Sequence, residues 1–140
     1  MMIRLILAAL CFLMFEVTRA QDEAIQQPEQ MPVALSCLDL ETQKDRDQCT
    51  AQALTQHVIN HLEYPKKARR KNISGMLIAR FVVHKNGQIG DVEILKSPDD
   101  ILDDPVKNAI FSMPEMHPGE IKGQALAVQY VLPIRFTLEN

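Results

Sequence analysis

His57 and His61 are the first residues whose types and spacing suggest chemistry. Four residues apart on a helix, they would share a face and could give two nitrogen ligands to a zinc ion. A zinc protease helix also needs a glutamate directly after the first histidine, and Val58 stands there. Because no third ligand is evident, we predict no metal site and no cofactor, and expect both histidines to border a helix–sheet interface.

A basic run follows the histidines, and its members fall within six positions: Lys66, Lys67, Arg69, Arg70 and Lys71. Such a run usually forms a solvated helical face, and the alternative is a local site for an acidic partner. We favour the solvated face.

Nothing else in the sequence indicates catalysis. It contains no nucleophile beside a base, no glycine-rich phosphate loop and no carboxylate pair in a promising context. The formal net charge of −3 argues against general nucleic-acid binding. We therefore expect that the protein is not an enzyme.

Residues 1–20 have the features of a secretory signal peptide. Arg4 supplies a positive charge, residues 5–15 form an apolar run, and Thr18, Arg19 and Ala20 resemble a cleavage site. The apolar run is well short of the ~20 residues that a spanning helix needs. We expect cleavage before Gln21, export, and no membrane span in the mature chain.

Cleavage would remove Cys11 and leave two cysteines, Cys37 and Cys49. An even count in an oxidising compartment predicts a disulfide between them, and two buried free thiols are the alternative. The two cysteines flank the end of a polar stretch, residues 21–44, which contains Pro28 and Pro32. We expect this stretch to be an extended or disordered lead-in to a domain at 45–140.

The last stretch, 124–138, has the clearest pattern in the chain. Every even position from Leu126 to Leu138 is apolar, which predicts a β-strand with one face on a core. The stretch is longer than the other predicted strands, so part of its edge would lack a partner. Pro133 also belongs on an edge strand, because proline cannot donate to a ladder. Such an edge is a surface to which an extended peptide can add.

Two helices and two further strands precede that stretch. Apolar spacing predicts a first helix at 45–62, with Asp45 or Asp47 as its N-cap, and a second helix capped by Asp103. Strands are predicted at 76–84 and 89–96, joined by a hairpin at Asn86-Gly87, with a bulge near Gly90 and Asp91.

The order of these elements determines the expected topology. The hairpin makes the first two strands antiparallel, and the second helix carries the chain back, so the last strand can pair with the first. The predicted fold is therefore α+β, with two helices packed on one face of a three-stranded antiparallel sheet in the order 2-1-3.

The order and spacing of several short motifs resemble the C-terminal domain of TonB proteins over roughly 55–138. The motifs are Tyr64-Pro65-x-x-Ala68, Ile73-x-Gly75, Phe81-x-Val83, Asn86-Gly87, Leu102-Asp103, Ala109-Ile110, Pro114, Pro118-Gly119, Gly123 and Leu132-Pro133-Ile134-x-Phe136. The family fold, two helices on a three-stranded antiparallel sheet, is the fold predicted above. The layout of a signal peptide, one domain and a cysteine pair looks like that of members seen among Bacteroidetes.

The resemblance implies a periplasmic binding domain linked to TonB-dependent transmembrane transport. Its partner would be the TonB box of an outer-membrane receptor, which pairs as an added strand with the last strand of the domain. The matching surface here is Ala125, Leu126, Ala127, Val128, Gln129, Tyr130 and Val131, and a second contact region in the family matches Tyr64 and Pro65. The alternative is a structural or regulatory module that forms a homodimer through the same edge.

This chain departs from energy-transducing TonB proteins in lacking an inner-membrane helix and a long proline-rich span. Met116 and Ala125 also stand where the family usually has an aromatic residue and a proline. Strand addition tolerates such changes, because its main-chain hydrogen bonds depend little on side chains. The missing anchor implies that another protein would have to supply force.

Overall fold

The computed structural model describes residues 24–137, so the predicted signal peptide and Leu138 lie outside the described residues. The elements, in chain order, are β1 (Val33–Ala34), η1 (Leu35–Cys37), α2 (Gln43–His61), α3 (Lys66–Arg70), β2 (Gly75–Val83), β3 (Ile89–Lys96), η2 (Asp100–Leu102), α4 (Asp103–Phe111), β4 (Met116–His117), β5 (Gly119–Ile121), β6 (Gln124–Leu126) and β7 (Val128–Phe136).

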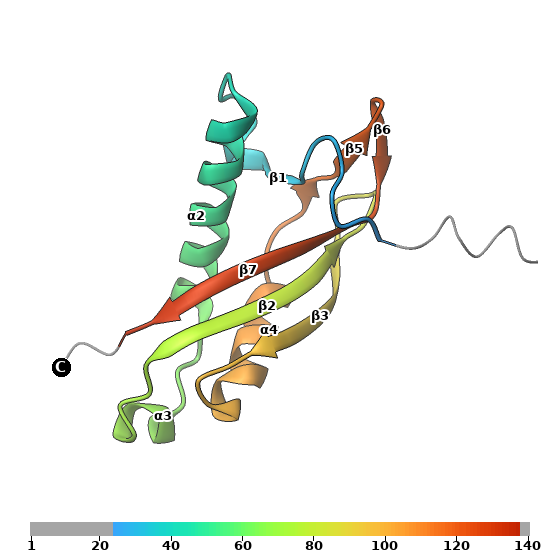
Figure 1. Cartoon of the computed structure of the whole chain (residues 1–140). Coiled ribbons are helices and arrows are strands. Elements are labelled where there is room, and N and C mark those ends of the chain that lie inside the picture. The colour runs from blue at the N-terminus through green and yellow to red at the C-terminus, as the bar shows by residue number, and fades with distance from the viewer. Residues whose placement is uncertain (1–23, 138–140) are drawn as a thin grey trace, which may run out of the picture.

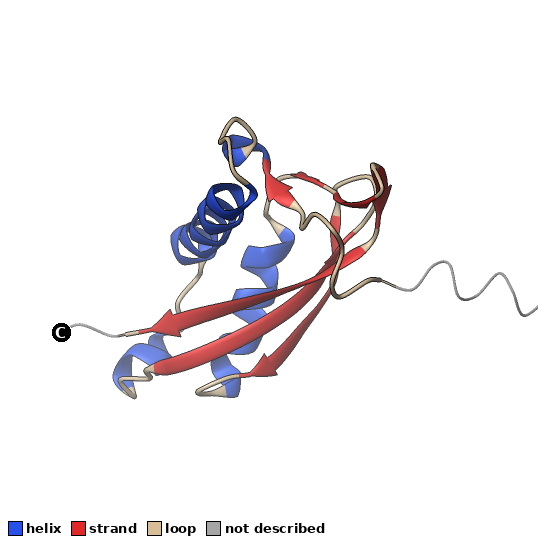
Figure 2. Ribbon diagram, turned by 45° about the horizontal axis from the view of Figure 1, so that its top comes forward, coloured by secondary structure: helices blue, strands red, loops and turns tan. Residues whose placement is uncertain are grey.

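The main sheet has three antiparallel strands in the order β3-β2-β7, which confirms the predicted topology. Helices α2 and α4 lie together on one face of this sheet, and the other face is free of helices (Figure 2). The fold is therefore the predicted two-layer α+β arrangement. Figure 1 shows β7 at one edge of the sheet and β3 at the other.

The alternation in the strand sequences determines which face carries the core. The buried positions of β2 are Leu77, Ala79, Phe81 and Val83, and those of β7 are Val128, Tyr130, Leu132, Ile134 and Phe136. They pack against buried residues of the helices, among them Leu54, Val58, Val106 and Ile110. Period-two alternation places each set on one face of the sheet, and the helices cover that face.

The hairpin between β2 and β3 has the predicted turn and bulge. Gly87 adopts a φ of +86°, and Asp91 a φ of +51° beside the register shift between Arg80 and Val82. An extra residue on β3 at this point is a β-bulge, which explains why Ile89 is out of phase with the apolar residues that follow it.

The predicted start of the first helix was wrong by two residues. Helix α2 begins at Gln43, and its N-cap is Thr42, whose hydroxyl accepts a hydrogen bond from the backbone N–H of Asp45 at 3.1 Å. The Thr42 backbone is extended, as an N-cap requires, whereas Asp45 and Asp47 already lie within the helix. The predicted cap Asp103 is likewise wrong, because it is the first residue of α4 and Leu102 precedes it as the N-cap.

The last predicted strand is interrupted at Ala127. Residues Gln124–Leu126 form β6, which pairs with β5 in a small hairpin, and β7 begins at Val128. The turn consists of Lys122 and Gly123, both with positive φ, which is the geometry of a two-residue hairpin turn. The expectation that the last strand exceeds the others was also wrong, because β2 and β7 have nine residues each and pair along their whole length.

The described first part of the lead-in is bound to the domain. We call Ala24–Ala34 the strap. It bridges β7 through Ile25 and β5 through Gln30, and its end forms β1, which pairs with β4. The predicted disulfide between Cys37 and Cys49 is present and joins η1 to α2 directly after the strap. In Figure 1 the strap lies against the start of β7.

Candidate functional site

The outer edge of β7 is the structural feature that could receive another chain. One edge of β7 pairs with β2 from Val128 to Phe136. The amide N–H of Gln129 points the other way, because it donates to the carbonyl oxygen of Ile25 at 2.9 Å. In an antiparallel ladder alternate residues direct both backbone groups to the same side, so Val131, Pro133 and Arg135 also face this outer edge.

Pro133 has a clear place in this arrangement. It lies opposite Ile78 in the β2–β7 register, and its nitrogen faces the outer edge, where no bond to β2 is lost. The prediction that Pro133 marks an edge strand is therefore confirmed. Val131 is 52 % exposed, and Pro133 and Arg135 are exposed as well.

The predicted contact residues 125–131 do not form one continuous edge. Ala125 and Leu126 belong to β6 and pair with Glu120 and Gly119. Val128 and Tyr130 bury their side chains in the core and direct their backbone groups to β2. The remaining members, Ala127, Gln129 and Val131, contribute to the outer edge.

The strap already occupies two of those three positions. The Ile25 N–H donates to the carbonyl oxygen of Ala127 at 2.9 Å, and Gln129 donates back to Ile25 as described above. The residue types had left open whether residues 21–35 occlude this edge. A signal was present, because Ile25 is the single large apolar residue among the polar residues 21–30.

Tyr64 and Pro65 lie at the opposite end of β7 from residues 125–128. The Tyr64 ring is 6.4 Å from the Phe136 ring, and its hydroxyl donates to the carbonyl oxygen of Ile73 at 3.3 Å. Pro65 is the N-cap residue of α3. At about 3.3 Å per residue, β7 separates its two ends by roughly 26 Å. The two predicted contact regions are thus joined by the outer edge and are not adjacent.

A cavity of about 460 Å³ adjoins Tyr64 at this far end. Its lining residues are Ile59, Leu62, Tyr64, Arg69, Arg135, Phe136 and Thr137. The Arg69 guanidinium lies 6.0 Å from the Tyr64 ring centroid. Burial raises the pKa of Tyr64, and the charge of Arg69 partly opposes that shift. The cavity therefore combines an apolar floor with two arginines.

The basic run falls in and beside α3, as a largely exposed face. Ala68, the residue that interrupts the run, is the buried one. Lys71 forms an ion pair with Asp99 at 3.8 Å, and in the described part of the chain no other member of the run has an acidic partner within that range. The solvated-face interpretation fits this exposure, and Arg69 alone of the run lines the cavity.

His57 and His61 stack on each other, with ring centroids 4.0 Å apart. His57 Nε2 lies 3.0 Å from the Ser112 hydroxyl, and that hydroxyl donates to the carbonyl oxygen of Ala109 at 2.7 Å. The serine proton is therefore directed away from His57, which leaves the imidazole as the donor. His61 Nδ1 lies 2.9 Å from the His57 carbonyl oxygen. Burial and the neighbouring His61 lower the pKa of His57.

These contacts place His57 between α2 and the end of α4, a contact between helices and not the predicted helix–sheet border. His61 is exposed and contacts its own helix through His57. Between residues 24 and 137 no group of three or more His, Cys, Asp or Glu side chains could hold a metal ion. The contact of His57 with Ser112 does not resemble an activated nucleophile, and the stack of His57 on His61 does not resemble a metal centre.

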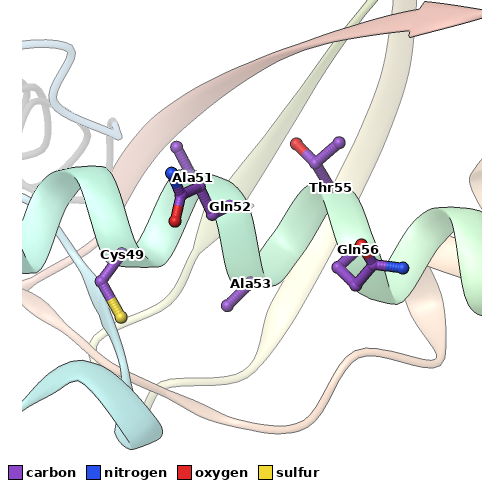
Figure 3. Close-up of a pocket in the computed structure, with 6 residues that line it drawn as sticks. All are labelled: Cys49, Ala51, Gln52, Ala53, Thr55 and Gln56. Carbon is purple, nitrogen blue, oxygen red and sulfur yellow. The ribbon is translucent and has the colours of Figure 1, made fainter.

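A shallow hollow of about 690 Å³ runs along α2 (Figure 3). Its described lining consists of small or uncharged residues, namely Cys49, Ala51, Gln52, Ala53, Thr55 and Gln56. Cys49 is held in the disulfide, so none of these residues supplies an ionisable group. The described lining therefore offers no catalytic chemistry.

Within residues 24–137, no helix has the length and apolar character needed to cross a membrane.

Comparison with known proteins identifies the family. A family model described as "Gram-negative bacterial TonB protein C-terminal" matches residues 60–138. A TonB C-terminal domain from Helicobacter pylori (its residues 194–285) is 22 % identical, with 64 % of this chain and 94 % of that chain covered and a TM-score of 0.47. A longer form of that domain is 20 % identical, with 76 % and 92 % covered and a TM-score of 0.49.

The TonB C-terminal domain of Pseudomonas aeruginosa is 26 % identical, with 56 % of this chain and 80 % of that chain covered and a TM-score of 0.46. No curated protein matches the chain. The family model covers more than half of the 140 residues. The chain therefore belongs to the Gram-negative bacterial TonB protein C-terminal family.

Proposed function

We propose that this domain binds an extended segment of an outer-membrane receptor by adding it as a strand to the outer edge of β7. Family membership implies a non-enzymatic role in TonB-dependent transport, through interaction with receptors in the periplasm. The strand-addition mode is our proposal, and the two contact regions, Tyr64-Pro65 and Ala125–Val131, are proposed as parts of one surface.

The observation that carries the proposal is the contact between Ile25 and β7. Ile25 makes two backbone hydrogen bonds to Ala127 and Gln129, so this edge accepts an extended segment without any change in the sheet. Past the Ile25 contact, towards the end of β7, the outer edge presents further backbone groups. They are the N–H of Val131, the carbonyl oxygens of Val131 and Pro133, and the N–H of Arg135. Those groups have no backbone partner among the described residues, and they would give an added strand its main-chain bonds.

The cavity beside Tyr64 would supply side-chain selectivity. A strand that follows β7 towards Phe136 arrives at this cavity, where Ile59, Leu62 and Phe136 offer apolar contact. Arg69 and Arg135 line the same cavity and would favour a segment that carries a carboxylate near an apolar residue.

The proposal predicts the result of an amide-shift titration by NMR with receptor peptides of the TonB-box type. The largest shifts should fall on the outer-edge amides of Gln129, Val131 and Arg135 and on Tyr64. Val131→Pro removes one outward N–H and puts the ring Cδ in the place of that hydrogen, so it should weaken binding about tenfold. Val131→Thr keeps that N–H and serves as the matched control.

Proline is placed at position 131 and not at 128, because only position 131 directs its N–H to the outer edge. The backbone N–H of Val128 faces β2, opposite Val83, so proline at 128 would break the sheet and would not test the outer edge. If Val131→Pro and Val131→Thr bound peptide equally well, the added-strand mode would be wrong. If no peptide bound, and Val131→Pro abolished a concentration-dependent dimer, the edge would serve homodimerisation.

A further inference from the structure

We infer that the first part of the strap is a built-in competitor for the peptide-binding edge, displaced when a receptor segment binds. We call this part, Ala24–Pro28, the arm, and Glu29–Ala34 the anchor. The inference rests on the proposed function, because it concerns the regulation of the same edge.

The arm covers one end of the outer edge and continues over the sheet. Ile25 takes the carbonyl oxygen of Ala127 and the N–H of Gln129, the first outward groups of the edge. Gln26 and Gln27 then line a hollow of about 260 Å³ on the helix-free face, together with Arg80, Leu95, Gln129 and Val131. The arm therefore occupies the edge and lies next to Val131, where the open part of the edge begins.

The arm itself is lightly held. Its backbone hydrogen bonds to the rest of the described chain are the two at Ile25, and both Gln26 and Gln27 are exposed. A short segment with few buried contacts and two exposed backbone bonds belongs to the least stable parts of a fold. Releasing the arm exposes little apolar surface.

The anchor is held far more firmly. Gln30 and Glu120 exchange two backbone hydrogen bonds, at 2.9 and 3.0 Å. The Glu29 carboxylate accepts the Lys122 N–H at 3.1 Å, and the Glu29 carbonyl oxygen accepts from the Gln43 side chain at the same distance. Val33 is 7 % exposed.

Gly119 explains how the anchor lies so close to β5 and β7. A Cβ at this position would lie 2.5 Å from Val128 Cγ2, 3.0 Å from the Gln30 carbonyl oxygen and 3.3 Å from Pro32 Cδ. The absence of a side chain lets the three segments meet. The disulfide between Cys37 and Cys49 then fastens the chain directly beyond the anchor.

The arm can therefore leave the edge while the anchor stays in place. A receptor segment that pairs along the whole edge, from Ala127 to Arg135, needs the groups that Ile25 occupies. Because the anchor tethers the arm, its local concentration at the edge stays high and does not depend on protein concentration. The two hydrogen bonds of Ile25, each of ordinary net strength, oppose peptide binding. A domain whose arm cannot pair should therefore bind the peptide about tenfold more tightly.

Ile25→Pro tests this inference. The proline has no N–H, and its Cδ would take the place of that hydrogen, too close to the Ala127 carbonyl oxygen for a carbon atom. The arm would be forced off the edge. Gln27→Pro is the matched control, because Gln27 is exposed and its N–H has no backbone partner among the described residues.

Two measurements are made on the full chain and both variants: hydrogen exchange of the Gln129 and Val131 amides, and titration with one TonB-box peptide. We expect Gln129 to exchange more slowly than Val131 in the parent and in Gln27→Pro. In Ile25→Pro it should exchange as fast as Val131, and the peptide should bind about tenfold more tightly.

The outcomes separate this inference from the proposed function. If the peptide binds the parent and Ile25→Pro equally, the arm is not a competitor, although the edge still binds peptide. If Gln129 exchanges as fast as Val131 in the parent, the arm does not hold the edge, and the inference is again overturned. If the peptide binds neither protein, the proposed function fails and its regulation with it.

Discussion

The amide N–H of Met116 donates a hydrogen bond to the carbonyl oxygen of Gly87 at 2.9 Å. This contact joins the turn of the β2–β3 hairpin to β4. It depends on a close approach of two backbones, because a Cβ added at Gly87 would overlap the carbonyl oxygen of Met116. Gly87 also has a φ of +86°, which glycine adopts without strain.

The first prediction is that Gly87→Ala destabilises the domain more than Gly123→Ala. Both glycines have positive φ, but a Cβ at Gly123 would meet nothing within 4 Å. Gly123→Ala should cost about 1 kcal/mol of unfolding free energy, from backbone strain alone. Gly87→Ala should cost about 3 kcal/mol or more, because the collision adds to the strain. Urea unfolding measures both, and equal losses would contradict the close approach.

The second prediction concerns Thr50, which is fully buried on α2 and whose hydroxyl accepts the Ala34 N–H at 3.1 Å. Thr50→Val keeps the shape but leaves that N–H without its partner, which should lower the unfolding free energy by about 2 kcal/mol. Thr55→Val is the control on the same helix, because Thr55 is partly exposed and its side chain has no hydrogen-bond partner within residues 24–137. A Thr50→Val protein as stable as the control would show that β1 does not depend on this bond.

The third prediction concerns the disulfide, which joins cysteines 12 residues apart. Closing such a loop restricts the unfolded chain, so replacing both Cys37 and Cys49 with serine should cost about 3 kcal/mol of stability. Chemical unfolding with and without a reductant measures the effect. Reductant should destabilise the parent and leave the double variant unchanged, and an equal response of both proteins would rule out a stabilising bond.

The fourth prediction is a pH dependence from Tyr130. Its ring stacks on Phe81 with centroids 5.3 Å apart, and burial, together with the nearby charge of Asp47, raises the pKa of its hydroxyl from 10.0 to about 12. Between these values the unfolded chain releases the proton and the folded chain keeps it. The free energy of unfolding therefore keeps this contribution in full below pH 10. It falls by roughly 3 kcal/mol as the pH rises to about 12.

Tyr130→Phe should remove this loss while keeping the ring contact with Phe81, so comparing the unfolding free energies of parent and variant isolates it. The chain has two tyrosines, and Tyr64→Phe leaves Tyr130 alone to be followed by phenolate absorbance. A midpoint near 10 in that protein would mean that the Tyr130 hydroxyl is not buried as described.

The alternation of apolar residues was enough to predict the strands and their buried faces, whereas the order of the sheet came from the hairpin and the helix after it. The prediction of the buried faces succeeded because successive side chains of a strand point to opposite faces. The order of apolar and polar residues therefore shows which face is buried. The Asn86-Gly87 turn and the edge position of Pro133 followed from the same kind of local rule, since each depends on one residue's own backbone limits.

The break at Ala127 was not predictable from that pattern, because Leu126 and Val128 continue the alternation across it. What divides the strand is the hairpin at Lys122 and Gly123, which turns β6 onto β5. A lysine–glycine pair is compatible with many loops, and its left-handed conformation is set by the strands that it joins.

The chain's residue types decided which strand lies at the edge and which of its faces is buried, since side-chain polarity and the missing proline N–H carry that information. They did not decide what occupies the edge. Ile25 reaches Ala127 and Gln129 through backbone atoms that every residue but proline possesses, so the residue types show no trace of the contact beyond the apolar Ile25 itself. Only the folded chain, with the anchor packed at Gly119 and fastened beyond it by the disulfide, brings the arm to β7.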